Sequence, residues 1–208
     1  KGMGIQDEYK AYCQKFNMVY KFMHQHSSHR EQVVKEICTL RGYTDKNMRN
    51  TLLKAGFIYI KDTSCLEKLK EPQFNDLALF KEDKFRLESR YIFPVRDMIG
   101  NVIALIGWLP TNEKTKYLTT PSKFFSKKSL FYGLEQLGHV GIGKNFFLVE
   151  GIFDSLSLRN LGFNALACMG IASSREKIAL YSLFRRLIAI SDKDIQGSKV
   201  VQNDAWSL

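Results

Sequence analysis

Apolar positions in the first part of the chain recur at helical spacing. Between residue 7 and about residue 70, side chains such as Tyr12 and Phe16 return every three or four positions, which predicts amphipathic helices. The second and third of these helices are expected to end at Gly42 and Gly56, because glycine takes the left-handed conformation that ends many helices. Helices of this kind normally serve packing, and we assign them no chemistry.

From about residue 85 the periodicity changes to that of β-strands. Residues 90–95 and 102–106 are predicted strands, and the turn at residues 97–101 should join them as a hairpin. Residues 111–133 have the composition of a basic loop.

The last third of the chain alternates predicted strands with predicted helices, which is typical of a parallel sheet. The expected strands are residues 146–149, 164–169 and 187–190; the expected helices are residues 153–161, one capped by Ser173 or Ser174 and running to about Leu183, and one starting near Gly197. The predicted fold class is therefore an α+β N-terminal part, with helices and a small β-sheet, followed by an α/β domain with a mainly parallel sheet. The corresponding regions are a helical segment at 1–84, a mixed β and basic-loop region at 85–140, and the α/β domain at 141–208.

Charge adds a hypothesis about the partner. The chain has 208 residues, with 31 Lys and Arg against 21 Asp and Glu, so its formal net charge is +10. A surplus of this size favours a polyanion such as nucleic acid, although a merely solvated basic surface remains an open alternative. No apolar run is long enough to cross a membrane, so we expect no membrane partner.

The cysteines argue against two kinds of small-domain stabilisation. Cys13, Cys38, Cys65 and Cys168 are far apart, and no two of them form a CxxC pair. We therefore expect no zinc site and no disulfide framework, and the four thiols fit a reducing, cytoplasmic compartment.

Basic and aromatic residues are interleaved in the expected loop. Lys116, Lys127 and Lys128 alternate with aromatic positions that include Tyr117. Positive charge together with stacking surfaces is the combination that binds single-stranded nucleic acid. The alternative is a solvated loop whose aromatic side chains anchor it to the core.

Four carboxylates fall at the ends of predicted parallel strands or one helical turn later. They are Glu150, Asp154, Asp192 and Asp194. Ligands of open parallel sheets bind beyond the carboxyl ends of the strands, so these acids should meet at one edge. Their mutual repulsion is relieved by a cation, and Mg²⁺ prefers such oxygen ligands. Single acids at strand ends more often cap helices or turns, but this set of four favours a metal site.

These motifs resemble a known family. Residues 149–154 (Val-Glu-Gly-Ile-Phe-Asp), followed by residues 192–197 (Asp-Lys-Asp-Ile-Gln-Gly), are similar to the Toprim domain of primases, topoisomerases and nucleases. Residues 90–97 (Arg-Tyr-Ile-Phe-Pro-Val-Arg-Asp) and 116–121 (Lys-Tyr-Leu-Thr-Thr-Pro) narrow the resemblance to bacterial and phage primases of the DnaG type, over about residues 30–208.

The resemblance implies a function and a site. It implies the core of a primase, an RNA polymerase that makes short RNA primers on single-stranded DNA from ribonucleoside triphosphates with Mg²⁺ or Mn²⁺, in the cytoplasm of a bacterial or phage-infected cell. The implied catalytic residues are Glu150, Asp192 and Asp194, which would hold the metal with Asp154 in support, and Lys116 and Lys127 match positions that hold nucleotide phosphates or the primer–template. Further candidates for nucleic-acid binding are Tyr117, Lys128, Arg90 and Arg96, although either arginine could equally be a surface charge. A replicative helicase would be contacted through regions outside this sequence.

The sequence also departs from the family pattern. Trp108 stands where a basic residue is usual, so it either stacks on a base or packs in the fold, and Thr119 replaces an asparagine. The sequence contains no zinc-binding module and no third acidic motif, which we interpret as truncation or divergence. Two alternatives therefore stay open, a metal-dependent Toprim nuclease and a non-catalytic module that binds single-stranded DNA. A topoisomerase is disfavoured, because no domain supplies a tyrosine nucleophile.

Overall fold

The structure is a computed structural model, and it describes residues 4–27, 29–111, 115–126, 129–169 and 175–190. Packing divides the chain into two compact units. Unit 1 comprises Lys1–Val95 and Asn101–Phe124, and unit 2 comprises Arg96–Gly100 and Phe125–Leu208. The three regions inferred from sequence remain a prediction about domain organisation. No helix among the described residues is long and apolar enough to cross a membrane.

Unit 1 begins with the three predicted helices. They are α1 (Ile5–Gln25), α2 (Arg30–Arg41) and α3 (Lys46–Ala55). The carboxylate of Asp45 accepts a hydrogen bond from the Asn47 N–H at 2.8 Å, which satisfies a free donor at the start of α3. Gly42 and Gly56 have φ angles of 68° and 76°, so both helices end in the left-handed conformation that the sequence predicted.

The segment between α3 and the main sheet continues the helical structure predicted up to about residue 70 and adds elements that the sequence did not predict. It contains two 3₁₀ helices, η1 (Thr63–Lys70) and η2 (Pro72–Leu77), and a hairpin of β1 (Phe80–Lys81) and β2 (Lys84–Phe85). The hairpin turn places Glu82 and Asp83 at φ angles of 49° and 62°. Asn and Gly usually occupy such positions, so the turn lacked its usual sequence signal.

The main sheet of unit 1 has three strands in the order β3 (Tyr91–Arg96), β4 (Val102–Trp108) and β5 (Tyr117–Thr119). The first two confirm the predicted strand pair. The third corrects the expectation of a loop at residues 111–133, because Tyr117 pairs with Trp108 and Thr119 with Ile106 in antiparallel register. A strand of three residues is too short to show periodicity in the sequence.

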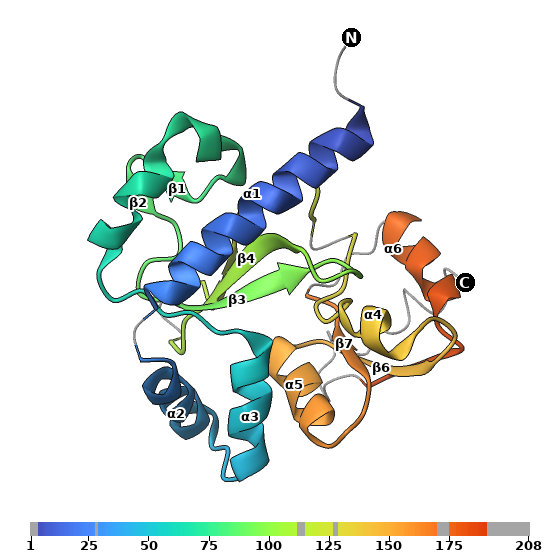
Figure 1. Cartoon of the computed structure of the whole chain (residues 1–208). Coiled ribbons are helices and arrows are strands. Elements are labelled where there is room, and N and C mark those ends of the chain that lie inside the picture. The colour runs from blue at the N-terminus through green and yellow to red at the C-terminus, as the bar shows by residue number, and fades with distance from the viewer. Residues whose placement is uncertain (1–3, 28, 112–114, 127–128, 170–174, 191–208) are drawn as a thin grey trace. The chain divides into compact units, whose positions relative to one another are not determined.

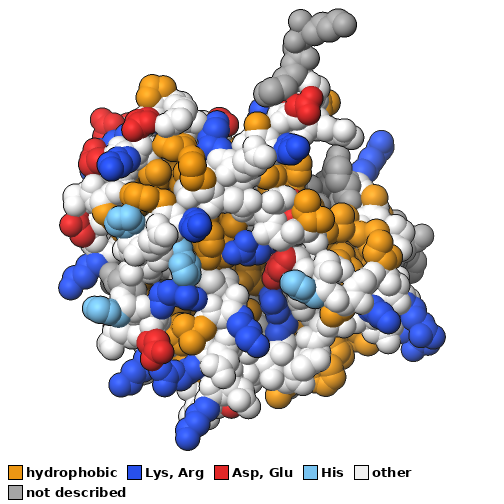
Figure 2. Space-filling model, viewed as in Figure 1, with side chains coloured by type: hydrophobic (Ala, Val, Ile, Leu, Met, Phe, Trp, Pro, Cys, Tyr) orange, Lys and Arg blue, Asp and Glu red, His pale blue; other side chains and the backbone are white. Residues whose placement is uncertain are grey.

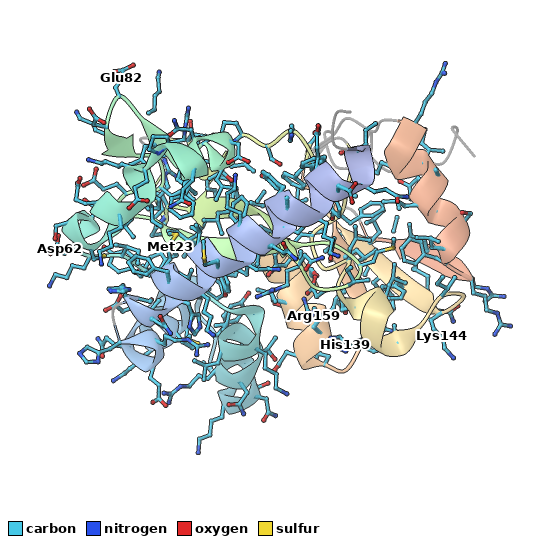
Figure 3. The ribbon with its side chains drawn as sticks, turned by 45° about the horizontal axis from the view of Figure 1, so that its top comes forward. Met23, Asp62, Glu82, His139, Lys144 and Arg159 are labelled. Carbon is cyan, nitrogen blue, oxygen red and sulfur yellow. The ribbon has the colours of Figure 1, made fainter. Side chains whose placement is uncertain are left out.

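Helix α1 packs along β4 and forms the core of unit 1 with it (Figure 1). Met23 of α1 is fully buried in this core (Figure 3). The buried hydroxyl of Tyr12 donates to the Ile103 carbonyl of β4 at 3.1 Å and lies 2.8 Å from Ser122 Oγ. One phenol therefore connects α1 to the sheet and to the segment after β5.

The Tyr12 phenol is expected to make the fold less stable at alkaline pH. Burial raises the pKa of Tyr12 to about 12, above the ordinary value of 10.0. A group whose pKa is higher in the folded state stabilises the fold below its unfolded pKa, and this stability is lost as the pH rises. We expect the free energy of unfolding, measured with urea, to fall between about pH 10 and pH 12. Tyr12→Phe should lower stability at pH 8 by about 1 kcal/mol and flatten this alkaline loss. If the free energy of unfolding of Tyr12→Phe falls with pH as steeply as that of the unmodified chain, Tyr12 is not responsible for the alkaline loss of stability.

Unit 2 is built on a parallel sheet in the order β7 (Ala165–Ala167), β6 (Asn145–Val149) and β8 (Arg186–Ala189). Both neighbours run parallel to the central strand β6, which confirms the predicted α/β class. The helices are α4 (Gln136–Val140), α5 (Ile152–Asn160) and α6 (Arg175–Leu180), the last followed by the 3₁₀ turn η3 (Tyr181–Leu183). The expected cap at Ser173 or Ser174 and the expected helix near Gly197 lie outside the described residues.

The side chains of β6 point alternately to the two faces of this sheet. Phe146 and Leu148 are buried in one core cluster with Phe131 and Phe184, against α4 and α6. Alternate residues of a strand point to opposite faces, so Phe147 and Val149 belong to the other face. Helix α5 packs against β6 and β7. Arg159 of α5, labelled in Figure 3, donates to Glu135 at 3.2 Å.

Candidate active site

The candidate site lies at the carboxyl edge of the parallel sheet in unit 2. Glu150 directly follows β6, the central strand, and is half-buried. Because β7 and β8 run parallel to β6, the carboxyl ends of all three strands meet at this edge. This is where ligands bind in open parallel sheets.

Gly151 shapes the turn from β6 into α5. Its φ angle of −101° is accessible to any residue, so the backbone conformation does not require glycine here. A Cβ atom at this position would collide with the carboxylate of Asp154. The Asp154 carboxylate therefore folds back over the first turn of α5, where the partial positive charge of the helix start favours an anion.

A pocket of about 220 Å³ opens beside these two acids. Its lining residues are Val149, Glu150, Asp154, Ser157, Leu158 and Ile190. The Ile190 N–H donates to the Leu148 carbonyl at 2.8 Å, which holds the end of β8 against β6. The structure thus brings Glu150 and Asp154 together, and Asp192 and Asp194 lie outside the described residues.

The donor set of the pocket fits a hard divalent cation. Carboxylate oxygens are the ligands that Mg²⁺ and similar ions take from proteins. Within the described ranges no group of three His, Cys, Asp or Glu residues is close enough to hold a metal ion. The predicted ligand set, which includes Asp192 and Asp194, stays a prediction.

Arg90 has a structural environment in unit 1. It is 8% exposed, and its Nη1 atom donates to the Thr115 carbonyl at 2.8 Å. Burial lowers the pKa of its guanidinium, which nevertheless stays charged at neutral pH. A Cβ atom on Gly107 of β4 would lie 2.7 Å from Arg90 Cδ, so this glycine provides the space for the arginine stem. Arg90 thus fixes the residue that precedes Lys116.

The other residues predicted to bind nucleotide or nucleic acid are distributed over both units. Lys116 is exposed and Tyr117 is half-buried at the start of β5, both in unit 1. Arg96 belongs to unit 2, where its Nη1 atom donates to the Gly100 carbonyl at 2.8 Å. Lys127 and Lys128 lie outside the described residues. The nucleic-acid roles of all these residues remain predictions.

Trp108 answers a question that the sequence left open. Trp108 is 2% exposed, and its ring lies 5.5 Å from that of Tyr91, so it packs inside unit 1. Sequence reasoning missed the part played by Gly107. A glycine inside an otherwise buried strand is a known sign of close approach, and this signal was available.

Lys and Arg side chains are numerous on the surface shown in Figure 2, including the part formed by α2 and α3. These two helices carry Arg30, Lys35, Arg41, Lys46, Arg49 and Lys54. Part of the basic surplus thus lies at the surface of unit 1, as binding to a polyanion requires.

Comparison with known proteins gives consistent matches. Residues 21–138 match the family "DNA primase catalytic core, N-terminal domain", and residues 147–206 match the Toprim-like family, which implies a divalent metal ion. The chain is 30% identical over 178 residues to a DNA primase of Thermotoga maritima, covering 78% of this chain and 31% of that protein. It is 32% identical over 173 residues to a DNA primase of Clostridium acetobutylicum, covering 76% of this chain and 28% of that protein. The chain thus spans about a third of the length of these relatives.

Solved structures show the same fold. A DnaG primase catalytic domain bound to single-stranded DNA superposes with a TM-score of 0.76 at 22% identity, covering 96% of this chain and 65% of that one. A DNA primase domain from Pseudomonas aeruginosa superposes with a TM-score of 0.69 at 26% identity, covering 93% of this chain and 65% of that one.

Proposed function

Because this chain belongs to the DnaG-type DNA primase catalytic core family, we propose that it is a DNA-directed RNA polymerase core. It extends short RNA primers on a single-stranded DNA template, using ribonucleoside triphosphates and a divalent metal ion. Its site of action is the cytoplasm of a bacterial or phage-infected cell. Contact with a replicative helicase would involve regions outside this sequence.

The observation that carries the proposal is the position of Glu150 at the carboxyl end of the central strand, beside the end of β8. Ile190 lines the same pocket as Glu150, and Asp192 and Asp194 follow two and four residues later. An extended chain advances at most about 3.6 Å per residue. Two and four residues of chain are therefore short enough to permit an acidic cluster at this edge.

We propose that Glu150, Asp192 and Asp194 hold the ions, with Asp154 in a supporting role. Mg²⁺ or Mn²⁺ bound there would supply stabilisation of the attacking 3′-oxygen and of the departing pyrophosphate. Glu150 and Asp154 place negative charge at this edge of the sheet. The pairing of β6 with β8 fixes how the two strand ends lie beside each other. Gly151 contributes by leaving room for the Asp154 carboxylate.

The cationic residues would bind the nucleic acid and the triphosphate. Lys116, Lys127, Lys128 and Arg96 supply positive charge for phosphates, and Tyr117 supplies a ring on which a base can stack. Arg90 would act through Thr115 by holding the start of β5 in place, since little of its own surface is exposed. The net charge of +10 is consistent with a polyanionic template.

A primer-extension assay tests this function. The chain is incubated with a short RNA annealed to single-stranded DNA, labelled ribonucleotides and Mn²⁺, so that selection of a start site is not required. We expect template-dependent lengthening of the RNA that stops when EDTA is added.

Two other results would contradict the proposal in distinct ways. Cleavage of the DNA with Mn²⁺ but without nucleotides would indicate a Toprim nuclease. Salt-sensitive binding of DNA that is unaffected by EDTA, with no extension, would indicate a binding module.

A further inference from the structure

Lys177 of α6 lies in the apolar core of unit 2. It is 0% exposed, and its Nζ atom lies 4.8 Å from the centre of the Phe131 ring. The same Nζ donates a hydrogen bond to the Cys168 carbonyl at 3.1 Å. Burying an ammonium group is costly, so its contacts must compensate for the lost hydration. One of these contacts reaches the end of β7.

Cys168 uses both of its main-chain groups at that point. Its carbonyl accepts from Lys177, and its N–H donates to the Val149 carbonyl at 2.8 Å. The Val149 carbonyl belongs to the peptide that joins Val149 to Glu150. Two hydrogen bonds through a single residue therefore connect the buried amine to the backbone that carries Glu150.

The backbone conformation is unusual at the same place. Met169, the residue after Cys168, has a φ angle of 57°, in the left-handed region that side chains rarely adopt. Such a conformation persists only where surrounding contacts hold it. The hydrogen bond from Lys177 fixes the carbonyl that immediately precedes this residue.

We propose that Lys177 is a positioning residue for the metal-binding edge. It fixes the Cys168 peptide, and through it the Val149–Glu150 peptide, so that the Glu150 carboxylate is presented in one orientation. The amine does this at a distance, without contact to the ion or the substrate. The inference rests on the proposed function only in taking Glu150 as a metal ligand.

Direct Mn²⁺ binding, followed by electron paramagnetic resonance on the full chain without nucleotides, tests this role. Lys177→Met keeps the apolar stem but removes the donor. Loss of groups that orient metal ligands typically weakens metal affinity about 10- to 100-fold. Lys177 acts one step further away, so we expect the Mn²⁺ dissociation constant to rise about fivefold. Lys177→Arg, which keeps a donor, should restore much of the affinity.

Ser155→Ala, in α5, is a matched control because it removes a different side-chain hydrogen bond to the same strand, β7. The buried Ser155 hydroxyl donates to the Ala165 carbonyl at 2.9 Å, at the opposite end of β7. Its loss should lower stability without changing Mn²⁺ affinity. Equal weakening by Ser155→Ala and Lys177→Met would overturn the proposal, because it would reflect general loosening of the strand.

The outcomes separate the two proposals. If the unmodified chain and Glu150→Gln bind Mn²⁺ equally, Glu150 is no ligand and both proposals fail. If Glu150→Gln weakens binding and Lys177→Met does not, only the positioning role fails.

Hydrogen exchange of the unmodified chain provides a test that does not depend on whether any variant folds. Coupling between two sites is reciprocal, so Mn²⁺ bound at Glu150 should slow amide exchange in residues 165–169. Slower exchange around residue 150 with no change in 165–169 would overturn the role of Lys177.

Discussion

Replacing Glu150 by glutamine is expected to lower metal-dependent RNA extension by about 100-fold or more. Glutamine has nearly the same shape as glutamate but lacks the negative charge and one of the two carboxylate oxygens. Loss of groups that merely orient metal ligands reduces affinity or activity by about 10- to 100-fold. Loss of a residue that binds the ion directly should therefore reduce the activity at least as much. The extension rate is measured over a range of Mn²⁺ concentrations, and the half-saturating concentration should rise as the rate falls.

Glu135→Gln provides the matched control for this experiment. Glu135 is also a half-buried glutamate of unit 2, but it pairs with Arg159 at 3.2 Å and does not line the pocket beside Glu150. The same substitution there removes the same charge, so its extension rate should stay within about twofold of the unmodified rate. A normal rate for Glu150→Gln, or an equal loss for both variants, would refute the assignment of Glu150.

The parts of the fold that the sequence predicted depend on local signals. The cap at Asp45 and the ends at Gly42 and Gly56 involve only neighbouring residues. The parallel sheet was predictable because strands buried on both sides are continuous apolar runs separated by helices. Glu150 could be placed at the edge of the sheet for the same reason, since it directly follows such a run.

The parts that the sequence did not predict depend on distant residues. Arg90 looks like a surface cation until Gly107, seventeen positions away along the chain, provides space for its stem and Thr115 its acceptor. Lys177 gave no signal either, because its burial depends on Phe131 and Cys168. Hydrophobic and charge patterns depend only on residues that are neighbours in sequence, so they do not reveal environments that distant residues create. The short strand β5 was missed because pairing with β4, rather than its own pattern, defines it.

Truncating Phe146 to alanine is expected to lower the free energy of unfolding by about 4 kcal/mol. The ring is 0% exposed on the central strand β6, and it packs edge-on against Phe184 with ring centres 5.1 Å apart. The substitution removes this buried area and leaves a cavity that the paired strands on either side cannot close. Urea unfolding followed by circular dichroism measures the change.

Phe163→Ala separates burial from the mere loss of a phenyl ring. Phe163 belongs to the same unit and contacts Phe147 with ring centres 5.2 Å apart, but it is 48% exposed. Its truncation should cost less than about 1 kcal/mol, because much of the ring already faces water. A comparable loss in both variants would mean that the core of unit 2 does not lie where Phe146 meets Phe184.

Because β6 also carries Glu150 at its end, Phe146→Ala should weaken Mn²⁺ binding only under conditions where it unfolds the strand. Weaker binding by fully folded Phe146→Ala would instead show that packing under β6 sets the orientation of Glu150.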